Sequence, residues 1–308
     1  AIAKALVGDE FPMIYRISAD EQIEGGLTIE DTKVISQVLE ANGIAAIHVS
    51  AGVYKSGAIV SAPTVIRTAV FSDYAKEIRN VVDIPVFAVN KIIYPHVAES
   101  LLKEGKADFV AMGRASIADP QFPNKVKGGR LDEIIFCIGC RQGCQWRIAQ
   151  QENVSCLVNP MTGKEHEYEI KEAEVKKKVM VVGGGPVGME AAIVVAKRGH
   201  DVTLYEKNNK LGGQWLLAAI PPGKELLNTF TVWQKGELER AGVKVVLNCE
   251  VTKGLVEQIL PDEIILASGA NPIIPGIPGA NKSHVYTAND VLLGKVDLTD
   301  HVVVIGGG

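Results

Sequence analysis

Hydrophobic residues in the first third of the chain come in short, nearly continuous runs that are separated by amphipathic stretches. The runs FPMIYRIS, IAAIHVSAG, IPVFAVN and ADFVAMGR predict strands, and the stretches over residues 28–42, 72–81 and 96–104 predict helices between them. Nearly continuous apolar strands that alternate with helices are typical of a parallel sheet. Four such strands make up about half of a (β/α)8 barrel.

The pattern changes after the fourth strand. Residues 120–133 are polar and contain proline and glycine, which predicts a loop, and KEHEYEIKEAEVKKK at 164–178 predicts a charged linker. From residue 178 onward, KVMVVGGGPVGMEAAIVVAKRGHDVTLYEK predicts strand, tight turn, helix and strand. The chain begins without Met and ends on VVVIGGG, a strand followed by half of a glycine-rich turn, so we expect a fragment of a longer protein.

The composition suits a soluble globular protein of about two domains, because the 308 residues are 47% hydrophobic and carry a formal net charge of −4. This balance gives no basic surface for nucleic acid. No apolar run approaches the roughly 18 residues of a membrane span, and the N-terminal AIAKALVGDE lacks the apolar core of a signal peptide. We therefore expect a cytoplasmic protein without membrane or nucleic-acid partners, whose clustered cysteines are metal ligands or redox centres before disulfides.

Four of the five cysteines lie in one stretch, CIGCRQGCQWRIAQQENVSC at 137–156. Their spacing, C-x2-C-x3-C-x11-C, brings three thiolates into one tight loop and returns a fourth from a short excursion. A cubane iron–sulfur cluster takes four thiolates, one for each iron, and closely spaced ligands suit its corners. Zinc could use the same ligands, although zinc sites more often show two similar CxxC arms, and a metal-free segment is a third option. The spacing favours a cluster held by Cys137, Cys140, Cys144 and Cys156.

A glycine pattern, G-x-G-x-x-G, follows the apolar strand at 178–182 and opens a helix. Gly183 permits the tight turn, Gly185 lets the backbone approach a pyrophosphate, and Gly188 lets helix and strand pack closely. Glu206 ends the next strand, where a carboxylate can accept a hydrogen bond from a ribose hydroxyl. With both flanks and the acid in place, the pattern predicts dinucleotide binding rather than a plain glycine-rich turn.

Several of these stretches together resemble one family. The chain resembles the old yellow enzyme-related iron–sulfur flavoenzymes in several stretches that occur in the same order. These stretches are YRIS with EGGLT, HVSAGVY, ADFVAMGRASIADP, the four-cysteine string and SCLVNP. That family includes 2,4-dienoyl-CoA reductase, clostridial 2-enoate reductase, bile-acid-pathway flavin oxidoreductases and trimethylamine dehydrogenase. The resemblance covers essentially the whole chain, and HVSAGVY is most like the 2-enoate reductase branch.

The resemblance implies an α/β fold with a defined division of the chain. It implies the C-terminal half of an FMN-binding (β/α)8 TIM barrel, then a four-cysteine [4Fe-4S] segment with its linker, then an incomplete Rossmann-like FAD-binding domain, and finally the beginning of an NAD(P)H-binding domain. These parts correspond to residues 1–133, 134–177, 178–300 and 301–308.

Two stretches downstream of the glycine pattern, LGGQW at 211–215 and ILASGANPIIPGIPG at 265–279, resemble the second and third FAD contacts of flavin-disulfide-reductase-like domains. Each is also an ordinary turn sequence. The resemblance implies FAD contacts at Gly213, Gln214, Ala267 and Gly269.

The resemblance also implies an FMN site in the first part of the chain. Arg16 matches the arginine beside the flavin ring, where a cation stabilises negative charge on the reduced flavin, with a rim salt bridge as the alternative. Barrel enzymes commonly bind phosphate after the last two strands. The matching FMN phosphate residues are Asn90, Lys91, Gly113 and Arg114.

Tyr54 ends HVSAGVY and takes the position at which dienoyl-CoA reductases have a histidine. A tyrosine there can donate a hydrogen bond to a substrate carbonyl or carboxylate and act as a catalytic residue. The alternative is an aromatic wall against substrate or flavin.

The cofactors implied by the family fit a reductase. NAD(P)H delivers hydride, whereas a cluster passes electrons singly, so a flavin is needed on each side. We expect electrons to pass from NAD(P)H through FAD, the cluster and FMN to the C=C bond of an unsaturated acid or acyl substrate. Two alternatives stay open: an amine dehydrogenase of the trimethylamine type, which holds ADP at the glycine loop, and a non-catalytic electron-carrying module. The choice of NADH or NADPH and the oligomeric state, a homo-oligomer included, are left open.

Overall fold

The computed structural model describes residues 2–8, 10–299 and 301–306, and the chain divides into two compact units, residues 1–168 and 169–308. The boundary falls inside the charged stretch 164–178, and residues 169–177 form neither helix nor strand. The four-cysteine segment lies within the first unit.

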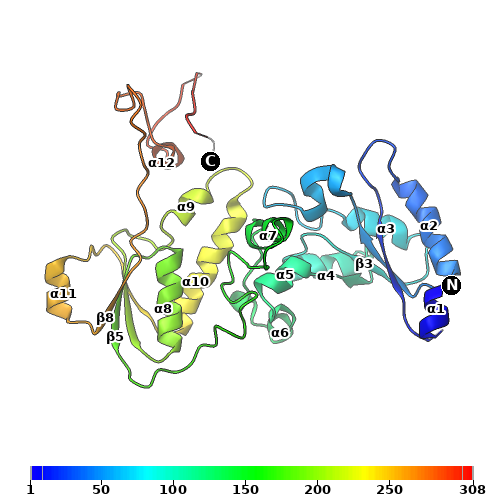
Figure 1. Ribbon diagram of the computed structural model, residues 1–308, viewed down its shortest axis with the longest axis horizontal. Helices are drawn as coiled ribbons and strands as arrows, with labels where there is room; N and C mark the ends of the chain where they lie inside the picture. The colour runs from blue at the N-terminus through cyan, green and yellow to red at the C-terminus, as the bar shows by residue number, and fades with distance from the viewer. Residues whose placement is uncertain (1, 9, 300, 307–308) are drawn as a thin grey trace. The chain divides into compact units, whose positions relative to one another are not determined.

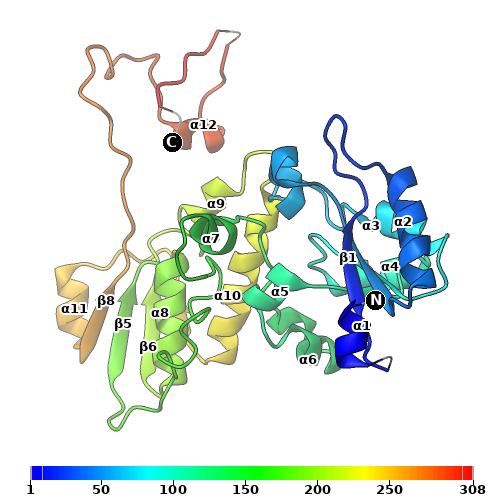
Figure 2. The ribbon, with the colours of Figure 1, turned by 45° about the vertical axis from the view of Figure 1, so that its right-hand side comes forward.

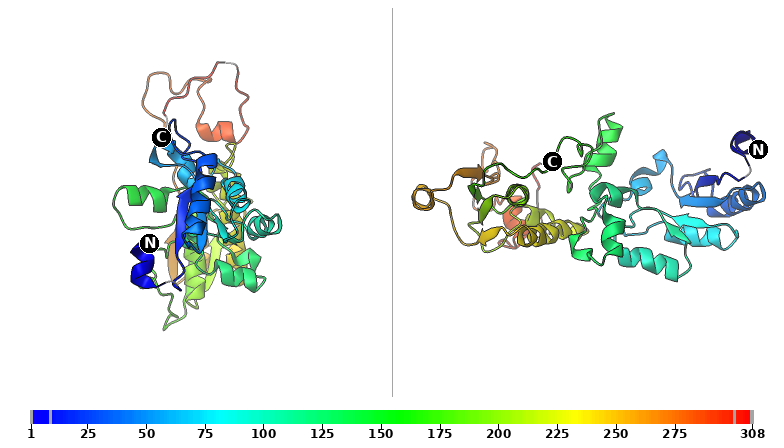
Figure 3. Two further views of the ribbon diagram at one scale, coloured as in Figure 1. Left: turned by 90° about the vertical axis from the view of Figure 1, so that its right-hand side faces the viewer. Right: turned by 90° about the horizontal axis from the view of Figure 1, so that it is seen from below.

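A four-stranded parallel sheet forms the centre of the first unit, with the strand order β1-β2-β3-β4 (Figure 1). The strands are β1 (Ile14–Ser18), β2 (Ala46–Ser50), β3 (Val86–Ala88) and β4 (Phe109–Val110). Three helices pack along one face of the sheet (Figure 3, left), namely α2 (Ile29–Ala41), α3 (Ser72–Arg79) and α4 (Pro95–Lys103). The alternation of strands and helices that the hydrophobic pattern predicts is confirmed.

The two faces of this sheet carry different side chains, because successive residues of a strand point to opposite faces. On the face covered by the helices, Ile47 and Val49 are fully buried and join the core of the unit. On the opposite face, the strand register places Arg16 beside His48, and His48 beside Phe87. The second face corresponds to the interior of a barrel.

Helix α2 is fixed to the sheet by polar contacts at its first turn. A capping box begins the helix: the Thr28 N–H donates to Asp31 Oδ2 at 2.9 Å, and the Asp31 N–H donates back to the Thr28 hydroxyl. The buried Thr32 hydroxyl donates to the Ala19 carbonyl at 2.6 Å. This contact ties α2 to the residue that directly follows β1.

The stretch 120–133, which the sequence predicts to be a loop, is largely helical. It holds α6 (Phe122–Lys127) and a 3-10 turn at Leu131–Glu133. Phe122 is buried and Pro123 stands in the first turn, where its missing N–H costs nothing. One turn of helix is too short to show a period in the sequence. The short helices α1 (Ile2–Val7) and α5 (Gly113–Ala118) escape prediction for the same reason.

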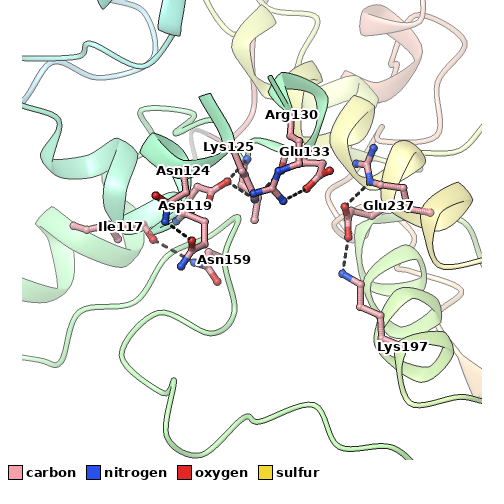
Figure 4. A network of polar contacts seen from close by, with 12 residues as sticks. Ile117, Asp119, Asn124, Lys125, Arg130, Glu133, Asn159, Lys197 and Glu237 are labelled. Carbon is pink, nitrogen blue, oxygen red and sulfur yellow. Dashed lines mark hydrogen bonds and ion pairs between the residues drawn. The ribbon is translucent and has the colours of Figure 1, made fainter. Parts of the chain in front are cut away.

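The second unit is built on another parallel sheet, with the strand order β7-β6-β5-β8 (Figure 2). The strands are β5 (Lys178–Val182), β6 (Asp201–Tyr205), β7 (Lys244–Val246) and β8 (Glu263–Leu266). Helix α8 (Pro186–Lys197) packs on β5 and β6, and α10 (Asn228–Arg240) packs on α8. The two helices are joined by Glu237, which accepts from Lys197 at 2.5 Å (Figure 4, right). The predicted order of strand, turn, helix and strand is confirmed.

The rest of the second unit contains three short helices, α9 (Trp215–Ala218), α11 (Lys253–Ile259) and α12 (Ala288–Leu292). Residues 270–276 leave the sheet without forming helix or strand (Figure 1, orange). Residues 301–306 form no strand, contrary to the prediction, because none of the described residues pairs with them. The predicted glycine turn at 306–308 lies mostly outside the described residues. No helix in the described part of the chain has the length and apolar composition to cross a bilayer.

Candidate functional site

The four cysteines of the segment 137–156 line one small cavity in the first unit, with a volume of about 20 Å³. Cysteine and apolar residues form most of its lining, and Arg114, Arg141, Gly143 and Ser155 complete it. All four thiols are half-buried, and none forms a disulfide. The structure therefore brings together the cysteines that the spacing groups, and Cys249 belongs to the other unit.

Backbone N–H groups lie near three of these sulfurs and lower the pKa of the thiols. Gly139 acts in this way on Cys137, Gln142 and Gly143 act on Cys140, and the two residues at 158 and 159 act on Cys156. Burial raises the pKa of all three thiols, that of Cys156 to about 11, and the N–H donors oppose this rise. The donors favour the thiolate, which is the form that binds a metal.

The two glycines between the cysteines allow a close approach that no other residue would permit. A Cβ on Gly143 would lie 2.5 Å from the Ser155 carbonyl oxygen, and one on Gly139 would lie 3.0 Å from the Thr64 nitrogen. The contacts in place are hydrogen bonds, from the Ser155 N–H to the Gly143 carbonyl at 2.7 Å and from the Thr64 hydroxyl to the Ile138 carbonyl at 2.6 Å. These two glycines were not predicted from the sequence, although their places between the cysteines are a usable signal.

The donor set consists of four thiols. Thiolates alone suit iron–sulfur clusters and zinc, and a zinc ion needs its sulfurs about 2.3 Å from one point. Among the described residues, no group of three or more His, Cys, Asp or Glu side chains is arranged to hold one metal ion. A cubane spreads its four sulfur ligands over four separate irons. The cavity is narrow, so the thiols have to turn apart to admit a cluster, and the cluster stays a prediction.

Both ends of the cysteine segment are anchored to helices α5 and α6 (Figure 4). Before the first cysteine, the buried Asp119 carboxylate accepts from Lys125 at 2.7 Å and from the Ile135 N–H at 3.0 Å. After the last one, the Asn159 amide donates to the Ile117 carbonyl at 3.3 Å. Because both anchors use buried polar side chains, the loop that carries the thiols is held in one position.

The predicted FMN phosphate residues converge, and three of them hold one loop, residues 59–66. Asn90 donates to the Ile59 carbonyl at 2.9 Å, and Arg114 donates to the Ala62 carbonyl at 2.8 Å and to Asn90 Oδ1 at 3.2 Å. A Cβ on Gly113 would meet nothing within 4 Å, so the backbone there is open to a ligand. A phosphate role for these residues stays a prediction.

Lys91 is buried, and all three of its ammonium protons are used within the protein. They go to the carbonyls of Pro63 at 2.8 Å, Thr64 at 2.7 Å and Ile66. Burial lowers the pKa of Lys91, and the nearby Arg114 charge lowers it further. The Lys91 side chain therefore supports the loop, and its ammonium has no proton left for a phosphate.

Replacing Lys91 by Met removes these three hydrogen bonds and keeps the length of the side chain. We expect the free energy of local opening to fall by about 2 kcal/mol, so that hydrogen exchange of residues 59–66 becomes about 30-fold faster. Mass spectrometry of the full-length protein measures this rate. Lys55→Met, at an exposed lysine just before the loop, is the control and should leave the rate unchanged. Equal rates in both variants would show that Lys91 does not hold the loop.

Arg16 lies on the barrel-interior face of the first sheet, as its prediction requires. Its Nη1 lies 3.1 Å from His48 Nδ1 and 3.2 Å from Nε2, so one ring nitrogen accepts a hydrogen bond. Burial lowers the pKa of His48, and the Arg16 charge adds to the effect, which keeps the imidazole neutral near pH 7. His48 was not predicted from the sequence as the residue that orients Arg16.

Tyr54 lies at the carboxyl end of the first sheet, the end at which barrel enzymes place their chemistry. It begins a 3-10 segment, η1 (Tyr54–Ser61), and its side chain is 99% exposed. The turn that contains it is closed by the Val53 N–H, which donates to the Ser56 hydroxyl at 2.8 Å. The exposed hydroxyl is free to reach a substrate, and its catalytic role stays a prediction.

The glycine pattern of the second unit makes the close approaches predicted for a dinucleotide loop. Gly183 has φ +107°, and a Cβ there would lie 2.3 Å from the Ala267 carbonyl oxygen. A Cβ on Gly188 would lie 1.9 Å from the Gly183 carbonyl oxygen, so helix α8 can pack against the turn only without one. At Gly185 a Cβ would meet nothing within 4 Å, which leaves the backbone open toward a ligand.

The two downstream stretches come to the same edge of the sheet as the glycine pattern. The Gly212 N–H donates to the Gly184 carbonyl at 2.8 Å, and a Cβ on Gly213 would lie 3.1 Å from the Gly185 Cα. The Gln214 amide donates to the Ala270 carbonyl, next to Gly269. Three stretches far apart in sequence thus form one cradle at the carboxyl ends of β5 and β8.

Glu206 closes this cradle from the end of β6. Its carboxylate is 5% exposed and accepts from the Gly184 N–H at 2.7 Å, from the Asn208 N–H at 2.8 Å and from the Asn208 amide at 2.6 Å. A carboxylate offers about four acceptor positions, so one stays for a ribose hydroxyl. Glu206 therefore shapes the glycine loop in addition to its predicted contact.

Replacing Glu206 by Ala in the full-length protein should lower FAD affinity about ten- to a hundredfold, because the glycine loop and the ribose both lose a charged acceptor worth about 1.5–3 kcal/mol. FAD retained after dilution and gel filtration measures the loss. Glu239→Ala, at an exposed glutamate of α10, is the control. Unchanged FAD retention in Glu206→Ala would count against the assignment.

Comparison with known proteins places each part of the chain. Residues 2–133 match the NADH:flavin oxidoreductase / NADH oxidase family, residues 181–231 an NAD(P)-binding Rossmann-like domain, and residues 243–308 the pyridine nucleotide-disulphide oxidoreductases. The chain is similar to an NADH oxidase of Thermoanaerobacter brockii, with 48% identity over 99% of this chain and 48% of the relative. A cinnamate reductase of Clostridium sporogenes is 35% identical over 99% of this chain and 48% of its own.

A solved structure of a 2-naphthoyl-CoA reductase in complex with 2-naphthoyl-CoA is similar as well. It has a TM-score of 0.91 and 34% identity, over 96% of this chain and 46% of that one. Relatives named as amine dehydrogenases also occur. The chain spans about half the length of the curated relatives it matches.

A barrel part of the NADH:flavin oxidoreductase type, followed by a Rossmann-like nucleotide domain, defines a class of flavin-dependent oxidoreductases. Within this class, the chain belongs to the old yellow enzyme-related family of 2-enoate reductases and trimethylamine dehydrogenase-like enzymes.

Proposed function

We propose that this chain belongs to an NAD(P)H-dependent flavin and iron–sulfur oxidoreductase that reduces the C=C bond of α,β-unsaturated carbonyl compounds, 2-enoates or enoyl-CoA-like esters. When bound, FMN and FAD would supply hydride chemistry at the substrate and NAD(P)H ends, and a [4Fe-4S] cluster would supply single-electron transfer between them. The observation that carries the proposal is the convergence of all four clustered cysteines on one cavity in the barrel-type unit.

Residues of the first unit would have separate roles at FMN, at the substrate and at the cluster. Arg16, oriented by a neutral His48, would place a positive charge beside reduced FMN. Tyr54 would donate a hydrogen bond from its hydroxyl to the substrate carbonyl, which makes the alkene carbon more electron-poor. The cavity cysteines would hold the cluster, and their anchored loop keeps its position fixed.

The residues of the second unit would hold FAD. The backbone at Gly185 is open toward the pyrophosphate, and Glu206 would accept from the ribose while it holds the Gly184 N–H. The stretches at 211–215 and 265–279 complete the cradle.

The amine dehydrogenase reading is the second candidate, because relatives with such names occur. Two measurements on the full-length anaerobic protein separate the readings. A reductase consumes NADH together with an unsaturated acid such as cinnamate and releases FMN and FAD when denatured. An amine dehydrogenase is reduced by a secondary or tertiary amine without NADH and releases ADP. Release of ADP with no NADH oxidation would overturn the proposal, and so would cofactor content without either reaction, as expected of a non-catalytic carrier.

A further inference from the structure

Arg141 occupies an unusual backbone position inside the cysteine loop. It lies between Cys140 and the turn Gln142–Trp146 and has φ +64°, in the left-handed region. That region suits glycine and asparagine, and a long side chain there is strained. The backbone of the turn is satisfied, since the Arg141 carbonyl accepts from the Trp146 N–H at 2.8 Å. Strain held at one residue of a ligand loop points to a use for its side chain.

The side chain of Arg141 carries an unused donor. Its Nε–H is buried and has no hydrogen-bond partner in the part of the chain that the structure describes. Buried N–H groups are nearly always paired, so an unpaired one marks a position where a further acceptor belongs. Arg114, the other guanidinium of the cavity, already donates to the Ala62 carbonyl and to Asn90.

The lining of the cavity limits what this acceptor can be. Arg141 shares the cavity with the four cysteines, Arg114, Ser155 and apolar side chains. None of the lining residues is a carboxylate, and the Ser155 hydroxyl donates to the Gly143 carbonyl at 3.4 Å. A cluster bound by four thiolates is negatively charged and exposes sulfur atoms, which accept N–H hydrogen bonds. Hydrogen bonds to the sulfurs and the net charge around a cluster are among the factors that set its reduction potential.

We propose that Arg141 donates its Nε–H to a sulfur of the iron–sulfur cluster and that this donor and its positive charge raise the reduction potential of the cluster. Arg141 is therefore a tuning residue for electron acceptance, separate from the four ligands. This inference rests on the proposed function, because it requires a cluster at the four cysteines.

The test replaces Arg141 by Asn and, separately, by Gly in the full-length protein. Both residues tolerate the left-handed conformation, so the fold and the thermal midpoint should be kept or improved. In an EPR-monitored redox titration under anaerobic conditions, we expect the equilibrium constant for one-electron reduction of the cluster to fall at least about tenfold, which is about 59 mV. Lys127→Asn removes the same charge from an exposed position of the first unit and should leave the potential unchanged.

The iron and sulfide content of the wild type and of both variants separates failure of the proposed function from failure of the inference on Arg141. If the wild-type protein holds no cluster, the proposed function fails. If the wild-type protein holds one and either variant keeps full iron content with the wild-type potential, the inference on Arg141 is wrong and the proposed function stands. If both variants lose their iron, Arg141 is needed for assembly, and the tuning role is wrong as well.

Discussion

Replacing Cys140 by Ala in the full-length protein should abolish electron flow from NADH to an unsaturated substrate, while NADH still bleaches the FAD absorbance. The reason is the separate placement of the two sites. Cys140 lines the cavity in the first unit, whereas the glycine cradle lies wholly in the second. In the proposed order, NADH transfers hydride to FAD before any electron reaches the cluster. The FAD step therefore does not require the Cys140 thiolate. Anaerobic stopped-flow absorbance follows the FAD step, and steady-state loss of the C=C bond follows the overall reaction.

Cys249→Ala is the matched control, because Cys249 is half-buried in the second unit and does not line the cavity. It should keep both activities and its full iron content. Cys140→Ala should instead bind less iron than the roughly four atoms per chain expected of the wild type. If Cys140→Ala keeps wild-type turnover with the substrate, the cavity cysteines have no part in electron transfer.

The second large effect is expected at Tyr54. If its hydroxyl polarises the substrate carbonyl, Tyr54→Phe should slow alkene reduction by pre-reduced FMN about 10- to 1,000-fold and leave NADH-driven flavin reduction untouched. The substitution keeps the ring and deletes only the hydroxyl. Because the side chain is 99% exposed, it should not change stability, so a rate change reports on chemistry.

Tyr15→Phe provides the comparison for this hydroxyl. Tyr15 is an exposed tyrosine of β1, and it points to the opposite face of the sheet from its neighbour Arg16. The Tyr15→Phe substitution should leave the rates of NADH-driven flavin reduction and of alkene reduction unchanged. If Tyr54→Phe also keeps both rates, Tyr54 only packs against substrate or flavin, and the catalytic acid is another residue.

Hydrophobic periodicity and residue spacing predict those parts of the protein that depend on local sequence. The strands of both sheets have continuous apolar runs, and Gly183 and Gly188 have the spacing that a tight turn and a packed helix require. Short helices such as α6 are not predicted, because one or two turns are too short to show a hydrophobic period. In α6 the buried residue is Phe122. Local signals thus suffice for the first sheet, for β5 and β6 and for the glycine turn, whereas β7 and β8 were not predicted and the apolar run at 301–305 forms no strand.

The contacts between distant residues were not predictable from the sequence. Lys91 matches a phosphate position, yet its ammonium binds three carbonyls of a loop some 25 residues earlier in the chain. Glu206 was expected to face a ribose, and it also holds Gly184. Arg141 showed no signal at all, since its strain and its unpaired donor exist only in the folded loop. Such roles depend on which carbonyls and sulfurs the fold brings near, and spacing does not contain that information.

The most direct measurement is the iron and acid-labile sulfide content of the full-length protein, purified anaerobically. The spacing of Cys137, Cys140, Cys144 and Cys156 and their common cavity predict about four irons and about four sulfides per chain. One zinc per chain with no sulfide would contradict the assignment of these cysteines to an electron-transfer centre.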